Sequence, residues 1–336
     1  MWKFLRRLKT GTDHRPSTPT ASEASAPAVD VGKLLHRLEW TVLKRLDGLL
    51  QGDYRTLLRG NGLELADLRE YQPHDDVRHI DWFATARMQT PYVRTYQEER
   101  DMTAWMIVDL SGSVRFGSAG RSKLDLALEL CGVMARMLTR RGNPVGGMLH
   151  LGGRQGIDRT VPAGSGRRHV LRLMHDMANA PTPDASNSTD LASVLRDAAG
   201  RLKRRSTVIV VSDFISAQPW QRDLSQLAQR HDVIAVRLRD PIELELPSVG
   251  VLPLRDAETG ELLWIDAQDP RLRRRFAEQS AQREAELKQR FVQAGVDCLE
   301  IDTQEPLDRA FIEFIRMRNP RLRARTAVTS GTPRHV

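Results

Sequence analysis

The sequence predicts an α/β fold: a doubly wound, mostly parallel β-sheet, preceded by a leading helix and a small β-rich excursion. From residue 102 onward, short apolar runs alternate with longer segments of helical periodicity. Runs such as TAWMIVDL and STVIVVSDF are apolar almost throughout, which is typical of strands covered on both faces. Alternation of such strands with helices favours parallel strands joined by helical crossovers.

The composition divides the 336 residues into four regions. Residues 1–29 are rich in Ser, Thr, Ala and Pro, so we expect a disordered basic arm and linker. Residues 30–101 should hold the leading helix and the β-rich excursion, and residues 102–318 the α/β domain. The remaining residues, 319–336, are expected to form a flexible basic tail.

The leading helix is predicted by an N-cap and by apolar periodicity. Asp30 suits the N-cap, and apolar residues then recur every three or four positions until about Gly52. The following segments LELADLREY, RHIDWFATAR and PYVRTYQEE are short and partly alternating, so we expect strands there. This excursion is short for a core of its own, and we expect it to pack beside the α/β domain.

The elements of the α/β domain follow from periodicity and from helix caps. After the first strand we expect a helix at KLDLALELCGVMARMLTRR with Gly142 as its C-cap, then a strand at PVGGMLHL. Helices at RRHVLRLMHDMANA, TDLASVLRDAAGRLKR and WQRDLSQLAQR flank the strands STVIVVSDF and DVIAVRLRD. A hairpin at VGVLPLRDAETGELLWID, a long helix over 270–294, the strand VDCLEID and the helix PLDRAFIEFIRM complete the domain.

The composition narrows the class of function. No apolar run approaches the roughly 18 residues that a membrane-spanning helix needs. The basic start lacks an apolar signal segment, so we expect a cytoplasmic protein, with peripheral contact at the inner membrane left open. The net charge of +8 is spread along the chain, and 5% aromatic residues supply few stacking platforms. Nucleic acid is therefore an unlikely partner, although a basic nucleic-acid or membrane-surface protein stays an alternative.

Three side chains at the end of the first buried strand could hold a metal ion. Asp109, Ser111 and Ser113 alternate, so in an extended backbone they would point to one side. One carboxylate and two hydroxyls are oxygen ligands of the kind that Mg²⁺ prefers, and they leave coordination positions open. The pattern alone is weak, because Asp and Ser are common in turns after strands.

Two further oxygen ligands are expected at the same edge of the sheet. Asp213 follows the buried strand STVIVVSDF, and Thr189 enters the helix beginning near TDLASVL. In open parallel sheets the carboxyl ends of the strands form the ligand-binding edge, so both should lie near Asp109. The simpler interpretation makes each of Thr189 and Asp213 a helix N-cap or a turn residue.

Together, DLSGS, STDLASVL and VIVVSDF resemble the metal-ion-dependent adhesion site of von Willebrand factor A-type domains. The resemblance implies a von Willebrand A-like or Rossmann-like sheet and a bound Mg²⁺ or another divalent cation. It further implies that Ser111, Ser113 and Thr189 bind the ion directly or nearly so, while Asp109 and Asp213 often act through water. A carboxylate from a protein partner would complete the coordination shell.

Residues 60–125 resemble the hallmark region of the domain-of-unknown-function 58 family, a bacterial group with a von Willebrand A-like core. His74 departs from the family, which usually has Gly there. The resemblance implies a non-enzymatic adaptor or cochaperone for a MoxR-type AAA+ ATPase that acts on an unknown client. The residues that carry it are Arg69, Tyr71, Asp75, Asp76, Arg78, Asp81, Trp82 and Arg87.

Two interpretations of the hallmark residues remain open. They could form an ion-pair network that holds the β-rich excursion to the core, which would need partial burial to contribute to stability. Alternatively, they form a docking face for the partner protein.

Enzymatic alternatives fit the sequence less well. A metal-dependent phosphotransferase with a phosphoaspartyl intermediate would usually carry a second Asp where Ser111 stands. A hydrolase with a serine nucleophile would want flanking glycines that DLSGS lacks. The chain also has no Walker A motif for ATP hydrolysis. We therefore expect a protein that is not an enzyme and has no small-molecule substrate.

Overall fold

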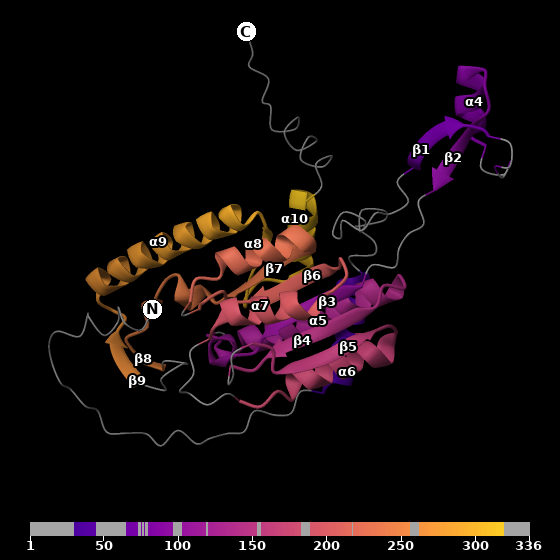
Figure 1. The fold of residues 1–336 in the computed structure, drawn as a ribbon. Coiled ribbons are helices and arrows are strands. Elements are labelled where there is room, and N and C mark those ends of the chain that lie inside the picture. The colour runs from indigo at the N-terminus through magenta and orange to yellow at the C-terminus, as the bar shows by residue number, and fades with distance from the viewer. Residues whose placement is uncertain are drawn as a thin grey trace, which may run out of the picture.

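In the computed structural model, a six-stranded sheet lies between two layers of helices, and a separate small unit contains α4 (Figure 1). The leading helix is described as far as Lys44, so its expected end near Gly52 lies outside the described residues. The residues that the structure describes are 30–44, 65–72, 75, 77, 80–96, 103–118, 120–152, 156–182, 189–216, 218–255 and 262–318.

The main sheet confirms the predicted α/β fold. Its order is β10-β7-β6-β3-β4-β5, and every pairing is parallel except that of β4 with β5. A helical crossover connects each pair of parallel neighbouring strands, as expected for a doubly wound sheet. The strands are β3 (Ala104–Asp109), β4 (Val145–His150), β5 (Arg159–Gly164), β6 (Thr207–Ser212), β7 (Asp232–Arg239) and β10 (Asp297–Asp302).

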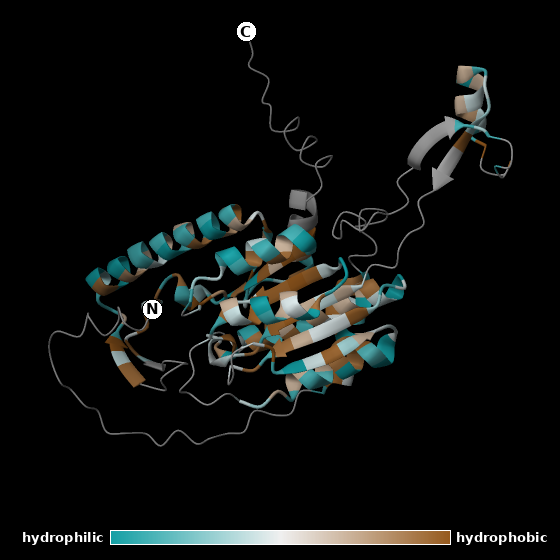
Figure 2. Cartoon of the chain, viewed as in Figure 1, coloured by the Kyte–Doolittle hydropathy of each residue, from teal (hydrophilic) through white to brown (hydrophobic). Residues whose placement is uncertain are grey.

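Helices cover both faces of the sheet. Successive residues of β3 alternate between them: Met106 and Val108 pack under α5, whereas Ile107 packs under α7. The first face also carries α2, α6 and α10, and the second carries α8 and α9. Figure 2 shows the strands as mostly hydrophobic between helices with hydrophilic outer faces. The helices are α5 (Lys123–Arg140), α6 (Arg167–Ala178), α7 (Leu191–Arg201), α8 (Gln221–Arg230), α9 (Pro270–Ala294) and α10 (Leu307–Arg318).

Strand β5 had no counterpart in the sequence prediction. Of its residues only Val161 is buried, because the strand forms the edge of the sheet and faces solvent. Pro162 interrupts its apolar pattern and cannot donate a ladder hydrogen bond, which is tolerated at an edge.

The leading helix α2 (Val31–Leu38) begins where the sequence predicted. The carboxylate of Asp30 accepts a hydrogen bond from the backbone N–H of Lys33 (3.1 Å). The helix continues as a π-helical turn over Glu39–Leu43, and its buried Leu35 and Leu38 join the core beneath α5 and α6.

The excursion before β3 is a two-stranded antiparallel sheet with one helix. β1 (Leu65–Glu70) pairs with β2 (Tyr92–Tyr96), and α4 (Trp82–Met88) lies between them in sequence. The expectation of a strand at RHIDWFATAR is wrong, because Asp81 caps a helix there through hydrogen bonds from Phe83 N and Ala84 N. Figure 1 shows this unit apart from the main sheet, whereas we expected it to pack beside the α/β domain.

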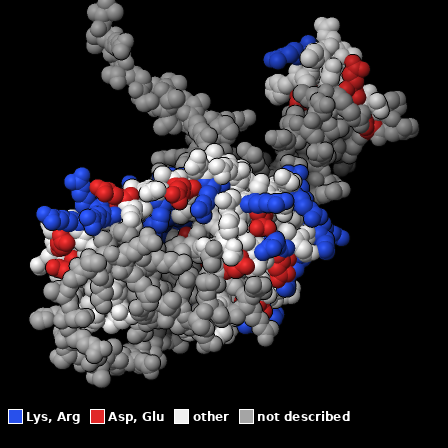
Figure 3. Space-filling model, turned by 60° about the vertical axis from the view of Figure 1, so that its left-hand side comes forward, with Lys and Arg blue, Asp and Glu red and all other residues white. Residues whose placement is uncertain are grey.

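The hairpin and the long helix expected after β7 are both present. β8 (Val251–Arg255) pairs antiparallel with β9 (Leu262–Asp266). Both signs of charge are interspersed along the rim where α9 lies (Figure 3), as in the exposed pair of Arg274 with Glu278 (3.0 Å). Over the described ranges, we find no helix whose length and apolarity would allow it to cross a membrane.

Candidate metal centre

The predicted metal ligands lie where the strand order of the sheet reverses. From β3, the chain first builds outward through β4 and β5, and then crosses back to add β6, β7 and β10 on the other side. Neighbouring crossovers leave opposite faces at such a point, which opens a crevice at the carboxyl ends of the strands. Asp109 ends β3, and Asp213 directly follows β6, so both carboxylates flank this switch point.

Asp109 is held rigidly in a buried position. Its Oδ1 accepts a hydrogen bond from Ser111 N (3.0 Å), and its Oδ2 accepts one from Ser212 Oγ (2.7 Å). Burial raises the pKa of the Asp109 carboxyl, and the nearby charge of Asp213 raises it further. This carboxylate is therefore oriented by two hydrogen bonds, and its charged form is disfavoured by burial and by Asp213.

Ser111 and Ser113 bring two hydroxyls together, although by a different backbone path than we predicted. Their Oγ atoms lie 3.3 Å apart. The assumption of an extended backbone was wrong, because Gly112–Arg115 form a 3₁₀ turn. The turn lets Val114 enter the core, where it is fully buried. Ser111 still contacts Asp109, and the hydroxyl of Ser113 lies next to that of Ser111.

Thr189 is buried and belongs to the loop that meets the end of β6. Its carbonyl accepts a hydrogen bond from Ser216 Oγ (3.2 Å), which in turn accepts one from Leu191 N (3.1 Å). The N-cap of α7 is Asp190 and not Thr189, since Asp190 Oδ1 accepts from Ser193 N (3.2 Å). The simpler interpretation of Thr189 as a helix N-cap is therefore wrong, and that of a turn residue stays a prediction.

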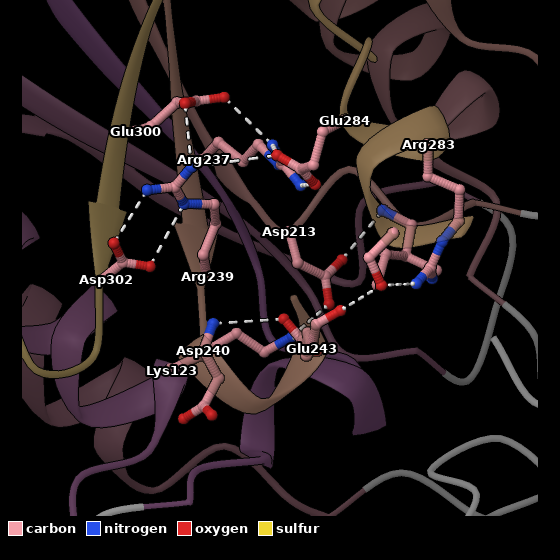
Figure 4. Close-up of polar contacts among 12 residues, drawn as sticks. Lys123, Asp213, Arg237, Arg239, Asp240, Glu243, Arg283, Glu284, Glu300 and Asp302 are labelled. Carbon is pink, nitrogen blue, oxygen red and sulfur yellow. Dashed lines mark hydrogen bonds and ion pairs between the residues drawn. The ribbon is translucent and has the colours of Figure 1, made fainter. Parts of the chain in front are cut away.

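Asp213 binds a buried lysine that the sequence prediction did not include. Its Oδ1 accepts from Ile215 N (3.0 Å), and its Oδ2 accepts from Lys123 Nζ (2.9 Å). Lys123 Nζ also donates to Glu243 Oε1 (2.8 Å), as Figure 4 shows. Burial alone would lower the pKa of Lys123, but the charges of Asp213 and Glu243 outweigh it and raise the pKa, so the ammonium stays charged.

One sequence signal could have revealed Lys123. It is the first residue of α5, where the positive end of the helix dipole disfavours a cation. A lysine at this position therefore indicates a carboxylate partner elsewhere. Those partners lie 90 and 120 residues away, on loops whose approach depends on the sheet topology.

Carboxylates crowd this edge of the sheet. Lys123 pairs with Asp213 and Glu243, the charge of Arg283 also acts on Glu243, and the charge of Asp213 acts on Asp109. Burial raises the pKa of Glu243 as well, and the charge of Lys123 opposes that shift. Neighbouring carboxylates repel one another strongly where the dielectric is low, so a divalent cation beside Asp109 and Asp213 would stabilise this arrangement.

The ligand types also fit such an ion, provided that hydroxyls take part. Within the described part of the chain, no group of three His, Cys, Asp or Glu side chains is placed to hold a metal by itself. The hydroxyls of Ser111 and Ser113 beside Asp109 supply the missing oxygens, and hard divalent cations accept such ligands.

A second ion-pair network supports the loop that carries Glu243. Arg237 pairs with Glu284 and Glu300 (Nη1 to Glu300 Oε1, 3.0 Å), and Arg239 pairs with Asp302 (Nη2 to Oδ2, 2.8 Å; Figure 4). These contacts fasten α9 and β10 to β7. Through α9, Ser280 Oγ donates to the carbonyl of Glu243 (3.0 Å), so the partner of Lys123 is anchored to the rest of the domain.

The hallmark residues in the small unit have different environments. Asp75 accepts a hydrogen bond from Gln72 N (2.8 Å), and Asp81 is buried as the cap of α4. Tyr71 is half-buried, and Arg87 is exposed on α4. Arg69 lies opposite Val93 in the β1–β2 ladder. Asp76 and Arg78 fall outside the described residues.

The outer surface of α4 is apolar. Trp82 is 70% exposed, Phe83 89% and Met88 58%. Exposed large apolar side chains that form a contiguous patch mark interaction sites in many soluble proteins. We call the surface formed by Trp82, Phe83 and Met88 the α4 surface.

The sequence of the chain matches one protein family over most of its length. The model of the family described as "Protein of unknown function DUF58" matches residues 67–286. The chain belongs to the DUF58 family. It is 34% identical over 284 residues to the uncharacterized protein Rv1480 of Mycobacterium tuberculosis, covering 84% of this chain and 88% of Rv1480. The uncharacterized protein Mb1516 of Mycobacterium bovis matches to the same extent.

Solved structures of low sequence identity resemble parts of this DUF58 protein. BatB from Bacteroides thetaiotaomicron is 14% identical, covers 65% of this chain and 98% of its own, and gives a TM-score of 0.40. The VWA domain of SpRpn10 is 12% identical, with coverages of 63% and 95% and a TM-score of 0.36. The fold class of the DUF58 protein follows from its own strand order.

Proposed function

We propose that this DUF58 protein is a non-enzymatic binding module that uses a divalent cation to capture an acidic residue of a partner protein. The pair of hydroxyls, Ser111 Oγ and Ser113 Oγ, 3.3 Å apart beside buried Asp109 at the switch point, supports the proposal most strongly. A strand-end crevice with oriented oxygen ligands and neighbouring carboxylates suits Mg²⁺ or a similar ion.

Each predicted ligand would have a distinct part in such a site. Ser111, Ser113 and Thr189 would offer neutral oxygens, and Asp109 a carboxylate fixed by two hydrogen bonds. Asp213 keeps one oxygen on Lys123, so its contribution would be mainly negative charge. Hydroxyl ligands leave coordination positions of the ion open, and a carboxylate from a partner would fill one of them.

The partner class comes from the family resemblance. We propose a MoxR-type AAA+ ATPase, with the DUF58 protein acting as its adaptor or cochaperone toward a client, in the cytoplasm. Membership of the DUF58 family supports this partner, because the hallmark residues belong to the matched range. The α4 surface offers a second contact, separate from the cation.

Binding of the purified MoxR-type ATPase from the same genome tests the proposal. Calorimetry would compare wild type with Asp109→Ala, each in Mg²⁺ and in chelator. A Mg²⁺ concentration of about 5 mM fills a site of micromolar to millimolar affinity. We expect binding only for wild type with Mg²⁺. Glu278→Ala on exposed α9 is the matched control and should bind like wild type. Equal binding by Asp109→Ala in chelator would refute the proposal.

A further inference from the structure

A buried histidine next to Asp109 has a ring nitrogen without a partner. His150 ends β4 and is the register partner of Asp109 in the parallel β3–β4 ladder. Partners in a parallel ladder point to the same face, so the imidazole and the carboxylate are neighbours. His150 is 2% exposed, and its Nε2 is buried without any hydrogen-bond partner among the described residues.

The other ring nitrogen fixes the state of the imidazole. Nδ1 lies 2.8 Å from the carbonyl oxygen of Gly156, which can only accept, so Nδ1 carries the proton. In a neutral imidazole Nε2 then presents a lone pair. The carboxylate of Asp158 adds to this support, with Oδ2 3.4 Å from Nδ1 and a second hydrogen bond from Leu151 N (2.7 Å).

The contacts of His150 Nδ1 with Gly156 and Asp158 are of the kind that orients metal-binding histidines. Such a histidine usually donates its second N–H to a carbonyl or carboxylate, which sets the tautomer and aims the free nitrogen. Leaving a buried acceptor unpaired is costly, so an imidazole held this way calls for a ligand on Nε2. The loop 156–158 occupies the Nδ1 side of the ring, which leaves Nε2 for the other side.

We propose that His150 Nε2 is a nitrogen ligand of the cation held by Asp109 and the two serine hydroxyls. This inference rests on the proposed cation site. An imidazole ligand favours first-row transition metals, whereas Mg²⁺ selects oxygen. The site should therefore take Mn²⁺ or Zn²⁺ in preference to Mg²⁺. Asp213 keeps one oxygen on Lys123, so Asp109 and His150 would be the direct carboxylate and imidazole ligands.

Pulsed electron paramagnetic resonance of bound Mn²⁺ tests this ligand directly. The wild-type protein with Mn²⁺ should show nitrogen modulation that changes when histidine is labelled with ¹⁵N. This measurement needs no variant, so it does not depend on how a substitution folds. Mn²⁺ bound without histidine nitrogen coupling would overturn the inference and leave the proposed function standing, whereas no Asp109-dependent Mn²⁺ or Mg²⁺ binding would overturn both.

Substitution gives the complementary test. We expect His150→Gln to weaken Mn²⁺ binding about 10-fold or more and to change Mg²⁺ binding less than about 3-fold. His175→Gln, on the exposed side of α6, is the matched control and should leave both affinities unchanged. Equal losses for Mn²⁺ and Mg²⁺ in His150→Gln would contradict a nitrogen ligand.

Discussion

The carboxyl edge of the main sheet and the α4 surface both depart from the rule that apolar side chains are buried and polar ones exposed, but they do so in opposite directions. At the edge, polar groups are buried: Asp109 is 2% exposed and Ser111 1%. On α4, apolar groups are exposed, with Trp82 at 70% and Phe83 at 89%. Buried polar groups and exposed apolar clusters are the informative exceptions to hydrophobic burial. We therefore propose a function for each, of a different physical kind.

The two regions differ in what offsets their unusual exposure to water. The buried polar groups of the edge are hydrogen-bonded to one another within the chain. The apolar side chains of α4 gain nothing from the fold and would be buried only by a partner. Substitutions at the edge should thus change stability, and substitutions on α4 should change binding alone.

The largest effect is expected for Lys123→Met. Removing the ammonium leaves Asp213 and Glu243 buried and uncompensated, and breaking a buried pair in this way costs about 3–5 kcal/mol. Urea unfolding of the α/β domain at pH 7 measures the loss. Adding Glu243→Gln to Lys123→Met should restore part of the stability, because one unpaired charge is then removed.

A loss below about 1 kcal/mol for Lys123→Met would mean that the edge is open to water, and that its charges are screened like a surface pair. The contrast with the α4 surface would then be one of composition and not of burial.

Lys123 also shows which features the sequence could predict. Strands, helices and the position of Asp109 at a strand end follow from local periodicity, which is why α5 and α9 were predicted well. The partners of Lys123 depend on contacts across 90 and 120 residues that no local pattern contains. β5 was missed because an exposed edge strand has little apolar signal, and α4 because one N-cap, Asp81, outweighed an ambiguous pattern.

The next largest effect is expected for Asp240→Asn, beside the same edge. Burial raises the pKa of Asp240, but hydrogen bonds from Ser118, Thr303 Oγ1 (2.8 Å) and Ile242 N (3.1 Å) outweigh it and lower the pKa. The side-chain NH₂ of asparagine would face these hydrogen-bond donors and could not accept from them. We therefore expect the free energy of unfolding to fall by about 2–3 kcal/mol at pH 7.

The stability that Asp240 contributes depends on pH. Because its folded pKa is depressed, its contribution is present above the unfolded pKa and is lost as pH falls through the folded pKa. Wild type should therefore lose stability more steeply than Asp240→Asn below about pH 4. Parallel acid unfolding curves for the two proteins would show that this carboxylate is not stabilised by its donors.

The smallest effect on stability, and the sharpest test of the contrast, is expected for the α4 surface. The double substitution Trp82→Ala and Phe83→Ala removes side chains that contact little in the folded chain, so unfolding should change by less than about 0.5 kcal/mol. Affinity for the MoxR-type ATPase should fall by about 2 kcal/mol or more, since exposed aromatics act as anchors once a partner buries them.

A matched control separates anchoring from a general loss of apolar surface. Val292→Ala, at an 80% exposed position on α9, should change neither stability nor affinity. If the double variant unfolds more easily and still binds the ATPase, the aromatic pair stabilises the small unit, and the two regions differ less than their exposure indicates. If stability is kept and binding is lost with Mg²⁺ present, partner capture needs both regions: an ion-dependent contact at the sheet edge and an apolar contact on α4.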